Sequence, residues 1–142
     1  MMYETAADLE REGGIVQIIC EAYKTAAFKL PQESRLDYIL TKNGKVNCLI
    51  EIKSRKCGFG DYTDYMISKG KYDALVAHGA RLHLPSVIFV QWTDRLGFIV
   101  VPCDHTEGHG GRRDRNDIRD LEKMVYIPID TFTWVDEYKR DI

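Results

Sequence analysis

Three ionisable residues stand in a mainly apolar stretch, residues 35–55, and their types are suited to act together chemically. Asp37 lies at the start of the stretch, and Glu51 and Lys53 lie near its end. Carboxylates are unusual inside hydrophobic strands, because burying a charge without a partner is unfavourable. A divalent cation is one partner that would explain both acids, since hard cations prefer carboxylate oxygens.

The same stretch is typical of a β-hairpin. Two apolar runs flank Asn43-Gly44, a pair of residues that tolerates positive φ in a tight turn. A two-residue turn at this point would pair Asp37 with Ile50, and Asp37 and Glu51 would then lie on opposite faces. The loop length therefore decides whether the acids can meet.

A three-residue loop, residues 42–44 with a left-handed G1 bulge at Gly44, gives a more consistent apolar face. It predicts the pairs Thr41–Lys45, Leu36–Ile50, Tyr38–Cys48 and Leu40–Val46. Register follows the hydrophobic pattern, so we favour this loop. It places Asp37, Glu51 and Lys53 on one face, with the Cβ atoms of the two acids roughly 5–7 Å apart.

Asp37 followed by Glu51-Ile52-Lys53 resembles the D…(D/E)xK signature of the PD-(D/E)XK nuclease superfamily, which has the restriction-endonuclease-like fold. Leu36 occupies the place of the signature proline, a departure common in that family. The order of elements over most of the chain also resembles its small members of the Holliday-junction-resolvase or phage type. The resemblance implies a metal-dependent nuclease that acts on DNA and uses Mg²⁺, with Mn²⁺ as a substitute.

The resemblance implies two further site residues. Glu12, one turn before the apolar run of the first expected helix, matches a glutamate that reaches toward the metal; the alternative is a solvated glutamate favoured by the helix dipole. Lys71 follows the extended segment 65–68 and opens the second expected helix, as a lysine does in small members of the family. The alternative is an exposed lysine, and the neighbouring Lys69 competes for the same role.

The expected mechanism uses these residues together. Asp37 and Glu51, with Glu12 and the backbone carbonyl of Ile52, would hold Mg²⁺. The ion would bind a phosphate oxygen and lower the pKa of a water. Lys53, two residues after Glu51 and so on the same strand face, would position the water or stabilise charge at phosphorus.

Length and composition are those of an ordinary globular domain. The chain has 142 residues, 44% of them hydrophobic and 30% charged, and we expect one domain over residues 1–142. The formal net charge of −2 implies that any DNA-binding surface is local. No segment is typical of a membrane span or a signal peptide, and four dispersed cysteines fit a reducing cytoplasm.

The expected fold is α/β, with a mixed central sheet of four or five strands flanked by helices. The pattern predicts helices over 6–29, with Thr5 as N-cap and an end near Pro31, and over 69–78, between a Ser68 cap and a Gly79 stop. It predicts extended segments over 62–67, 86–92, 96–101 and 124–129. Residues 102–120 should form a surface loop.

Other clusters have less specific patterns. Cys103, His105 and His109 have a spacing that could hold zinc, but no fourth ligand is evident and surface histidines are favoured. Two basic groups could contact phosphates, one at 112–119 and one formed by Lys42, Lys45, Lys53, Arg55 and Lys56. Interspersed aspartates make a solvated loop equally consistent with the first group.

Two other interpretations of these residues compete with the nuclease function. One is a non-catalytic module that kept the fold and binds nucleic acid or protein. The other is a structural ion pair between Asp37 and Lys53 with no metal. Cleavage of branched DNA and action as a homodimer follow only from analogy with small family members.

Overall fold

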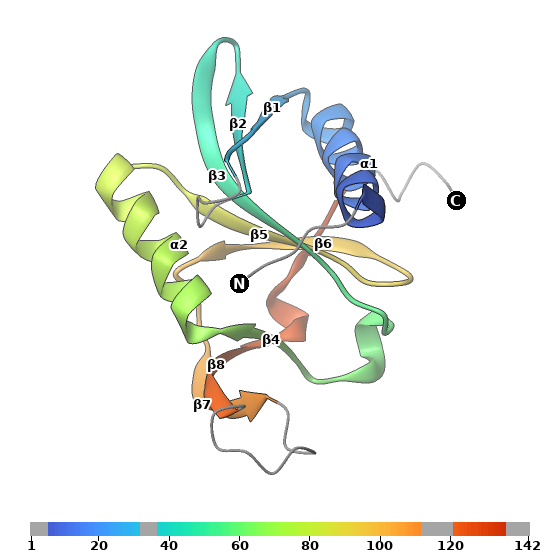
Figure 1. Cartoon of the computed structure of the whole chain (residues 1–142), viewed down its shortest axis with the longest axis vertical. Coiled ribbons are helices and arrows are strands. Elements are labelled where there is room, and N and C mark those ends of the chain that lie inside the picture. The colour runs from blue at the N-terminus through green and yellow to red at the C-terminus, as the bar shows by residue number, and fades with distance from the viewer. Residues whose placement is uncertain (1–5, 32–36, 112–120, 136–142) are drawn as a thin grey trace.

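The computed structural model describes residues 6–31, 37–111 and 121–135, which form a six-stranded sheet, a three-stranded sheet and two helices (Figure 1). The large sheet has the order β1 (Ala26–Lys29), β2 (Tyr38–Lys42), β3 (Lys45–Ser54), β5 (Ser86–Gln91), β6 (Leu96–Val101) and β9 (Thr133–Trp134). Only the β3–β5 pair is parallel. The α/β class and mixed sheet are confirmed, and the predicted four or five strands were too few.

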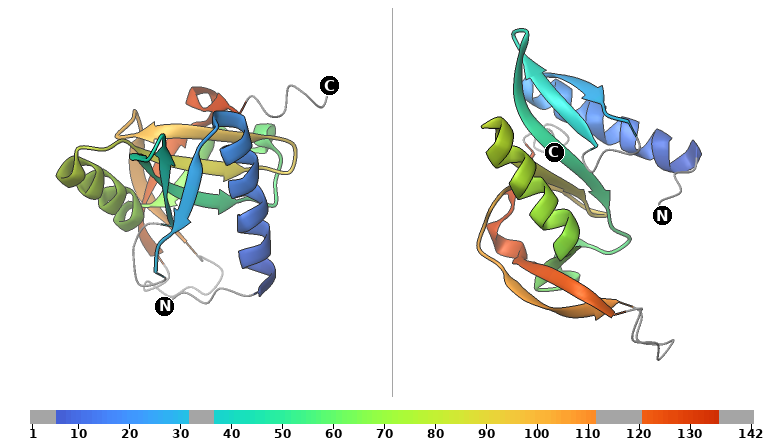
Figure 2. Two further views of the ribbon diagram at one scale, coloured as in Figure 1. Left: turned by 90° about the horizontal axis from the view of Figure 1, so that it is seen from above. Right: turned by 60° about the vertical axis from the view of Figure 1, so that its left-hand side comes forward.

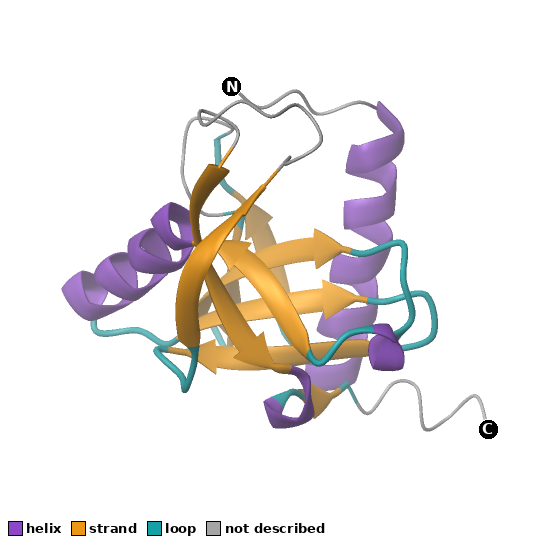
Figure 3. Ribbon diagram, turned by 90° about the horizontal axis from the view of Figure 1, so that it is seen from below, coloured by secondary structure: helices purple, strands orange, loops and turns teal. Residues whose placement is uncertain are grey.

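The helices α1 (Ala6–Tyr23) and α2 (Lys69–Leu82) lie on opposite sides of the large sheet (Figures 2 and 3). On one side, α1 packs on alternate residues of the hairpin strands; the buried set includes Ile15, Ile19, Tyr38, Leu40 and Ile50. On the other side, α2 and the small sheet cover a second core that includes Leu49, Tyr65, Leu75, Ile88 and Val125. In the described part of the chain, no helix has the length and apolar character needed to cross a membrane.

The small sheet joins segments far apart in sequence, in the order β4 (Asp64–Ser68), β8 (Leu121–Pro128) and β7 (Thr106–Gly111). It lies at the opposite end of the molecule from the β2–β3 turn (Figure 2). The predicted loop over 102–120 was therefore wrong for residues 106–111, because pairing with β8 makes a strand of a polar, glycine-rich segment. Residues 112–120, with the predicted arginine cluster, lie outside the described residues.

The hairpin register differs from the predicted one. The turn has two residues, Asn43 and Gly44, both with positive φ, and Lys42 pairs with Lys45. The register then shifts within β3, since Thr41 faces Val46 whereas Leu40 faces Cys48, which leaves Asn47 as the extra residue of a bulge. The predicted bulge at Gly44 was wrong, and so were the pairs derived from it.

The bulge places Asp37 and Glu51 on the same face of the hairpin. A two-residue turn without a bulge would place them on opposite faces. At the open end of the hairpin Tyr38 faces Ile50, so the preceding residue, Asp37, stands level with Glu51. Both acids are thus on the face away from α1, since Tyr38 and Ile50 point toward it. A single inserted residue decides this, because a shift of one position turns every following side chain to the other face.

The first helix ends at Tyr23, not near Pro31 as predicted. Lys24 has a φ of 55°, and the amide of Thr25 donates to the carbonyl of Cys20 at 3.1 Å, as in a Schellman ending. The next residues form β1, an edge strand antiparallel to β2. The alanines there continue the apolar helical pattern, but the open edge of β2 provides backbone partners that the local pattern does not reveal. The predicted Thr5 cap lies outside the described residues.

The cap of α2 is confirmed, because the Ser68 hydroxyl accepts a hydrogen bond from the amide of Lys71 at 3.2 Å. The predicted stop at Gly79 was wrong. The helix continues to Leu82, and His83 provides the left-handed C-cap. Gly79 instead allows close packing, since a Cβ there would lie 2.6 Å from the Ser86 hydroxyl oxygen and 2.8 Å from the Leu84 carbonyl oxygen.

A Gly79→Ala substitution is therefore expected to destabilise the protein by about 2 kcal/mol, despite the better helix propensity of alanine. The Ser86 hydroxyl cannot move away without loss of its 2.7 Å hydrogen bond to Leu75. Gly70→Ala in the same helix is the matched control, since a Cβ there meets no atom within 4 Å. Urea unfolding should show a loss for the first variant and none for the second; equal stability of the two would contradict the packing role.

Candidate active site

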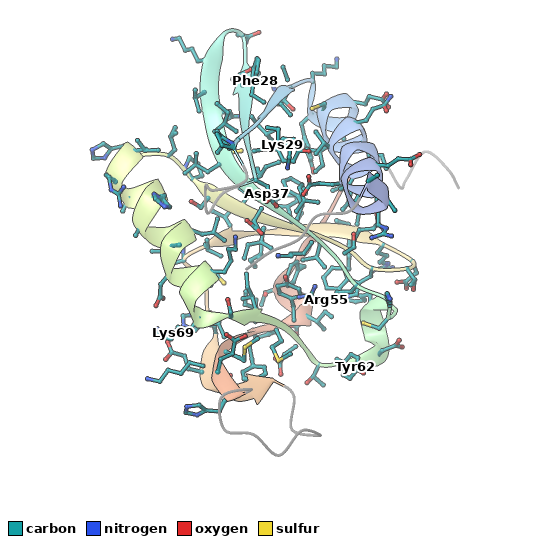
Figure 4. All side chains as sticks on the ribbon, in the orientation of Figure 1. Phe28, Lys29, Asp37, Arg55, Tyr62 and Lys69 are labelled. Atoms are coloured by element: carbon teal, nitrogen blue, oxygen red, sulfur yellow. The ribbon has the colours of Figure 1, made fainter. Side chains whose placement is uncertain are left out.

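Asp37 is positioned directly before β2 by two hydrogen bonds. Its backbone carbonyl accepts from the amide of Leu30, and its side-chain Oδ2 accepts from the amide of Ile52, both at 2.9 Å. The second bond ties the side chain to β3, the strand that carries the ExK tripeptide. Figure 4 shows Asp37 near the middle of the molecule, with Arg55 and Tyr62 successively closer to the end formed by the small sheet.

Glu51 is the buried centre of the site. Its residue is 0% exposed, yet within the described chain neither side-chain oxygen accepts a hydrogen bond. Two ammonium groups lie slightly further away: Lys53 Nζ is 3.3 Å from Oε2 and Lys71 Nζ is 3.4 Å from Oε1. A buried carboxylate with incomplete hydrogen bonding is unfavourable for folding and is therefore a functional-site candidate.

The electrostatics of Glu51 reflect this position. Burial raises the pKa of Glu51 to about 7, and the nearby charge of Asp37 acts in the same direction. The ammonium groups of Lys53 and Lys71 oppose the shift. Two acids and two amines therefore interact at one place, drawn from the segment before β2, from β3 and from the first turn of α2.

The structure distinguishes the two lysines that open α2. Lys71 faces Glu51, whereas Lys69 forms ion pairs with Asp73 at 3.2 Å and Glu107 at 3.1 Å. Lys71 is thus the lysine brought to the site. Residues 69 and 71 are about 200° apart around a helix, so only one of them can point at the sheet.

Glu12 is placed differently. Its Oε2 accepts from Lys29 Nζ at 2.9 Å and from the Tyr38 hydroxyl at 3.1 Å, on the α1 side of the sheet. Lys29 also lies over the Tyr38 ring. These contacts tie α1 to β1 and β2 beside Asp37, and the participation of Glu12 in catalysis or metal binding stays a prediction.

The donor set fits a hard divalent cation. The described residues contain no cluster of three or more His, Cys, Asp or Glu side chains placed to hold a metal, and the two carboxylates that lie close together here are those of Asp37 and Glu51. Glu51 has the orphaned oxygens noted above, which a cation would satisfy. The carbonyl of Ile52 points to the same edge of β3 as its amide, and therefore toward Asp37. Oxygen donors of this kind suit Mg²⁺ or Mn²⁺.

The alternative of a structural ion pair between Asp37 and Lys53 is not found among the described residues. Lys53 pairs with Glu51, and the Asp37 side chain accepts from a backbone amide. The basic cluster around the hairpin is also divided. Lys42 and Lys45 lie exposed at the turn, whereas Lys53 and Arg55 continue the row of Glu51.

The predicted histidine group has a local structural role. The Tyr72 hydroxyl contacts the Cys103 amide at 2.9 Å and His105 Nδ1 at 3.2 Å, which ties α2 to the segment before β7. His109 lies within β7 opposite Lys123. Metal binding by this group has no support in the described residues.

Tyr65 and Arg55 also lie near the site; the sequence placed Arg55 only in a basic group that could contact phosphates, and Tyr65 only in the extended segment before Lys71. Tyr65 is 2% exposed and close enough for the charge of Glu51 to raise its pKa further, although burial is the larger cause. The Arg55 guanidinium lies 4.7 Å from the Tyr65 ring centre and opposes that shift. The period of two from Glu51 through Lys53 to Arg55 was the available signal for Arg55.

A mixed sheet between two helices, with an acid before one strand of a hairpin and an ExK tripeptide on the other, defines a nuclease-type protein of the PD-(D/E)XK class. Residues 1–135 match the family model described as "Phage putative PDDEXK endonuclease", and the chain belongs to this family.

A solved structure agrees with this assignment. The fold is similar to that of Hjc, a Holliday junction resolvase from the archaeal hyperthermophile Archaeoglobus fulgidus, with a TM-score of 0.62 and 14% identity. The alignment covers 91% of this chain and 98% of the resolvase chain. At this identity the likeness concerns the fold alone. No curated protein matches the sequence.

Proposed function

We propose that this chain is a metal-dependent endonuclease that hydrolyses phosphodiester bonds of DNA. One observation carries the proposal: Glu51 is fully buried, the described residues leave the hydrogen bonding of its oxygens incomplete, and it lies next to Asp37 and to two ammonium groups at 3.3 and 3.4 Å. A merely structural glutamate at this position would be expected to have its oxygens satisfied by the protein. Membership of an endonuclease family supports the same function.

The residues that would hold the cation are Asp37, Glu51 and the Ile52 carbonyl, with Glu12 as a further ligand predicted by resemblance. When bound, Mg²⁺ or Mn²⁺ would neutralise phosphate charge and make a water more acidic. Asp37 is oriented for this role by the Ile52 amide, which fixes Oδ2, while Oδ1 accepts no hydrogen bond from the described residues.

Two lysines of the site would contact the phosphate of the substrate. Lys53 and Lys71 have partly exposed side chains, 28% and 19%, so their ammonium groups can meet both buried Glu51 and a phosphate outside. They attract the backbone of DNA and stabilise negative charge that develops on phosphoryl oxygens. They also favour the charged form of Glu51, against the effect of its burial.

The expected substrate is branched DNA. Its support is the fold shared with a Holliday junction resolvase. Action as a homodimer remains a prediction. The competing function is a non-catalytic module that binds nucleic acid or protein, and the complete set of Asp37, Glu51 and Lys53 speaks against it.

The test is to incubate the purified protein with four-way junction, plain duplex and single-stranded DNA, in Mg²⁺, Mn²⁺ or EDTA. We expect cleavage with either metal, none in EDTA, and faster cleavage of the junction than of the duplex. Gel analysis of end-labelled strands would report it. Binding without cleavage in every metal condition would instead support the non-catalytic module.

A further inference from the structure

A cavity of about 500 Å³ lies next to the site, where β3 ends beside β4 and β8. Most of its lining is aromatic or apolar, and it has one cationic side chain, Arg55, and one acidic side chain, Asp64; the aromatic and apolar residues include Tyr62, Tyr65, Met66, Trp92 and Tyr126. Figure 4 shows Arg55 and Tyr62 closer than Asp37 to the end of the molecule that carries the small sheet. Tyr62 is 66% exposed and Met66 40%, so the mouth of the cavity is apolar and open to solvent.

One residue of the cavity wall, Tyr65, has a buried polar group without a partner among the described residues. Tyr65 is 2% exposed, and in the described part of the chain its hydroxyl has no hydrogen-bond partner. Its ring is held edge-on against Trp92 and under the guanidinium of Arg55. A buried phenol without a hydrogen bond is unfavourable, and a ligand with a polar edge would satisfy it.

The cavity continues the row of residues that forms the site. Glu51 and Lys53 alternate along one face of β3, and Arg55, the residue directly after the strand, continues this row, so it lies roughly 13 Å beyond Glu51. That length corresponds to a few nucleotides of one DNA strand. The Arg55 guanidinium itself is fixed, since it donates to the Met66 carbonyl at 3.0 Å and to the Ser54 carbonyl at 3.1 Å.

We propose that this cavity binds one unstacked nucleobase of the DNA strand whose backbone lies at Glu51, an inference that rests on the proposed nuclease function. A nucleobase is planar, with apolar faces for the aromatic walls and polar edges for the Tyr65 hydroxyl. Its phosphate carries the charge that Arg55 attracts. The cavity therefore selects DNA with unpaired nucleotides close to the cleaved bond, because a base inside a duplex cannot enter it.

Binding measured in EDTA tests this without any need for cleavage. The probes are a fluorescently labelled duplex with a single-stranded tail, the same duplex with an abasic tail, and the blunt duplex. We expect the wild-type protein to bind the tail with bases roughly five-fold or more tightly than the abasic tail, as base–aromatic stacking suggests. Tyr62→Ala and Tyr65→Phe should each reduce this ratio, while binding to the blunt duplex stays unchanged.

Phe28→Ala is the matched control, since Phe28 is also an exposed aromatic residue, 55% exposed, and lies at the other end of the molecule (Figure 4). It should keep the ratio of the wild type. Thermal melting checks that Tyr62→Ala and Tyr65→Phe remain folded. Equal affinity for the two tails, or a ratio that neither variant changes, would overturn the nucleobase site. A preserved ratio in a protein that never cleaves DNA would refute the nuclease function alone.

Discussion

Replacement of Glu51 by glutamine is expected to reduce the rate of DNA cleavage by at least about 10³-fold. Glutamine keeps the size of the side chain but removes the charge that a cation requires, and it ends the pairing with Lys53 and Lys71. Single-turnover cleavage of a DNA junction in Mg²⁺ measures the effect.

Matched variants distinguish a loss of catalysis from a general disruption of the fold. Glu107→Gln removes an exposed acid that pairs with Lys69, the lysine of α2 that does not face Glu51. This variant should cleave DNA at the wild-type rate. Lys71→Gln should slow cleavage by about ten-fold or more, whereas Lys69→Gln should not. Full activity of Glu51→Gln would remove the basis of the proposed function, whatever the controls show.

The same Glu51→Gln substitution should make the metal-free protein more stable at neutral and alkaline pH. Burial raises the pKa of Glu51 from 4.5 to about 7, so between these values the native state holds a proton that the unfolded chain has lost. The free energy of unfolding of the wild type therefore falls as pH rises through this window, and glutamine avoids the loss. The variant should gain about 3 kcal/mol at pH 8 and little at pH 4.5.

Urea unfolding in EDTA at several pH values between 4.5 and 8 measures this difference. Parallel stability curves for the two proteins would show that Glu51 titrates normally and is not a strained group. Mn²⁺ added at pH 8 should raise the melting temperature of the wild type, because the cation binds the charged Glu51. It should leave the melting temperature of Glu51→Gln unchanged. A cation that stabilises both equally binds elsewhere.

Local signals in the sequence were sufficient for the existence of the hairpin and for the cap of α2, and they drew attention to Asp37, Glu51 and Lys53, which the structure brings close together. Asn43-Gly44 predicts a tight turn, in which both residues have positive φ, and the Ser68 hydroxyl satisfies an amide within its own helix start. Such signals depend on neighbours in the chain, and they can be recognised without the rest of the fold. The α/β class followed from the same patterns, and the family match agrees with the resemblance.

Tertiary structure alone decided the details that align the site. The bulge at Asn47 sets Asp37 level with Glu51, and contact with β3 selects Lys71 over Lys69. Strands β1 and β7 exist because another strand offers them backbone partners, although their sequences suggest a helix and a loop. Local preferences amount to fractions of a kcal/mol per residue, so the long-range pairing of backbone groups and the burial of apolar faces outweigh them.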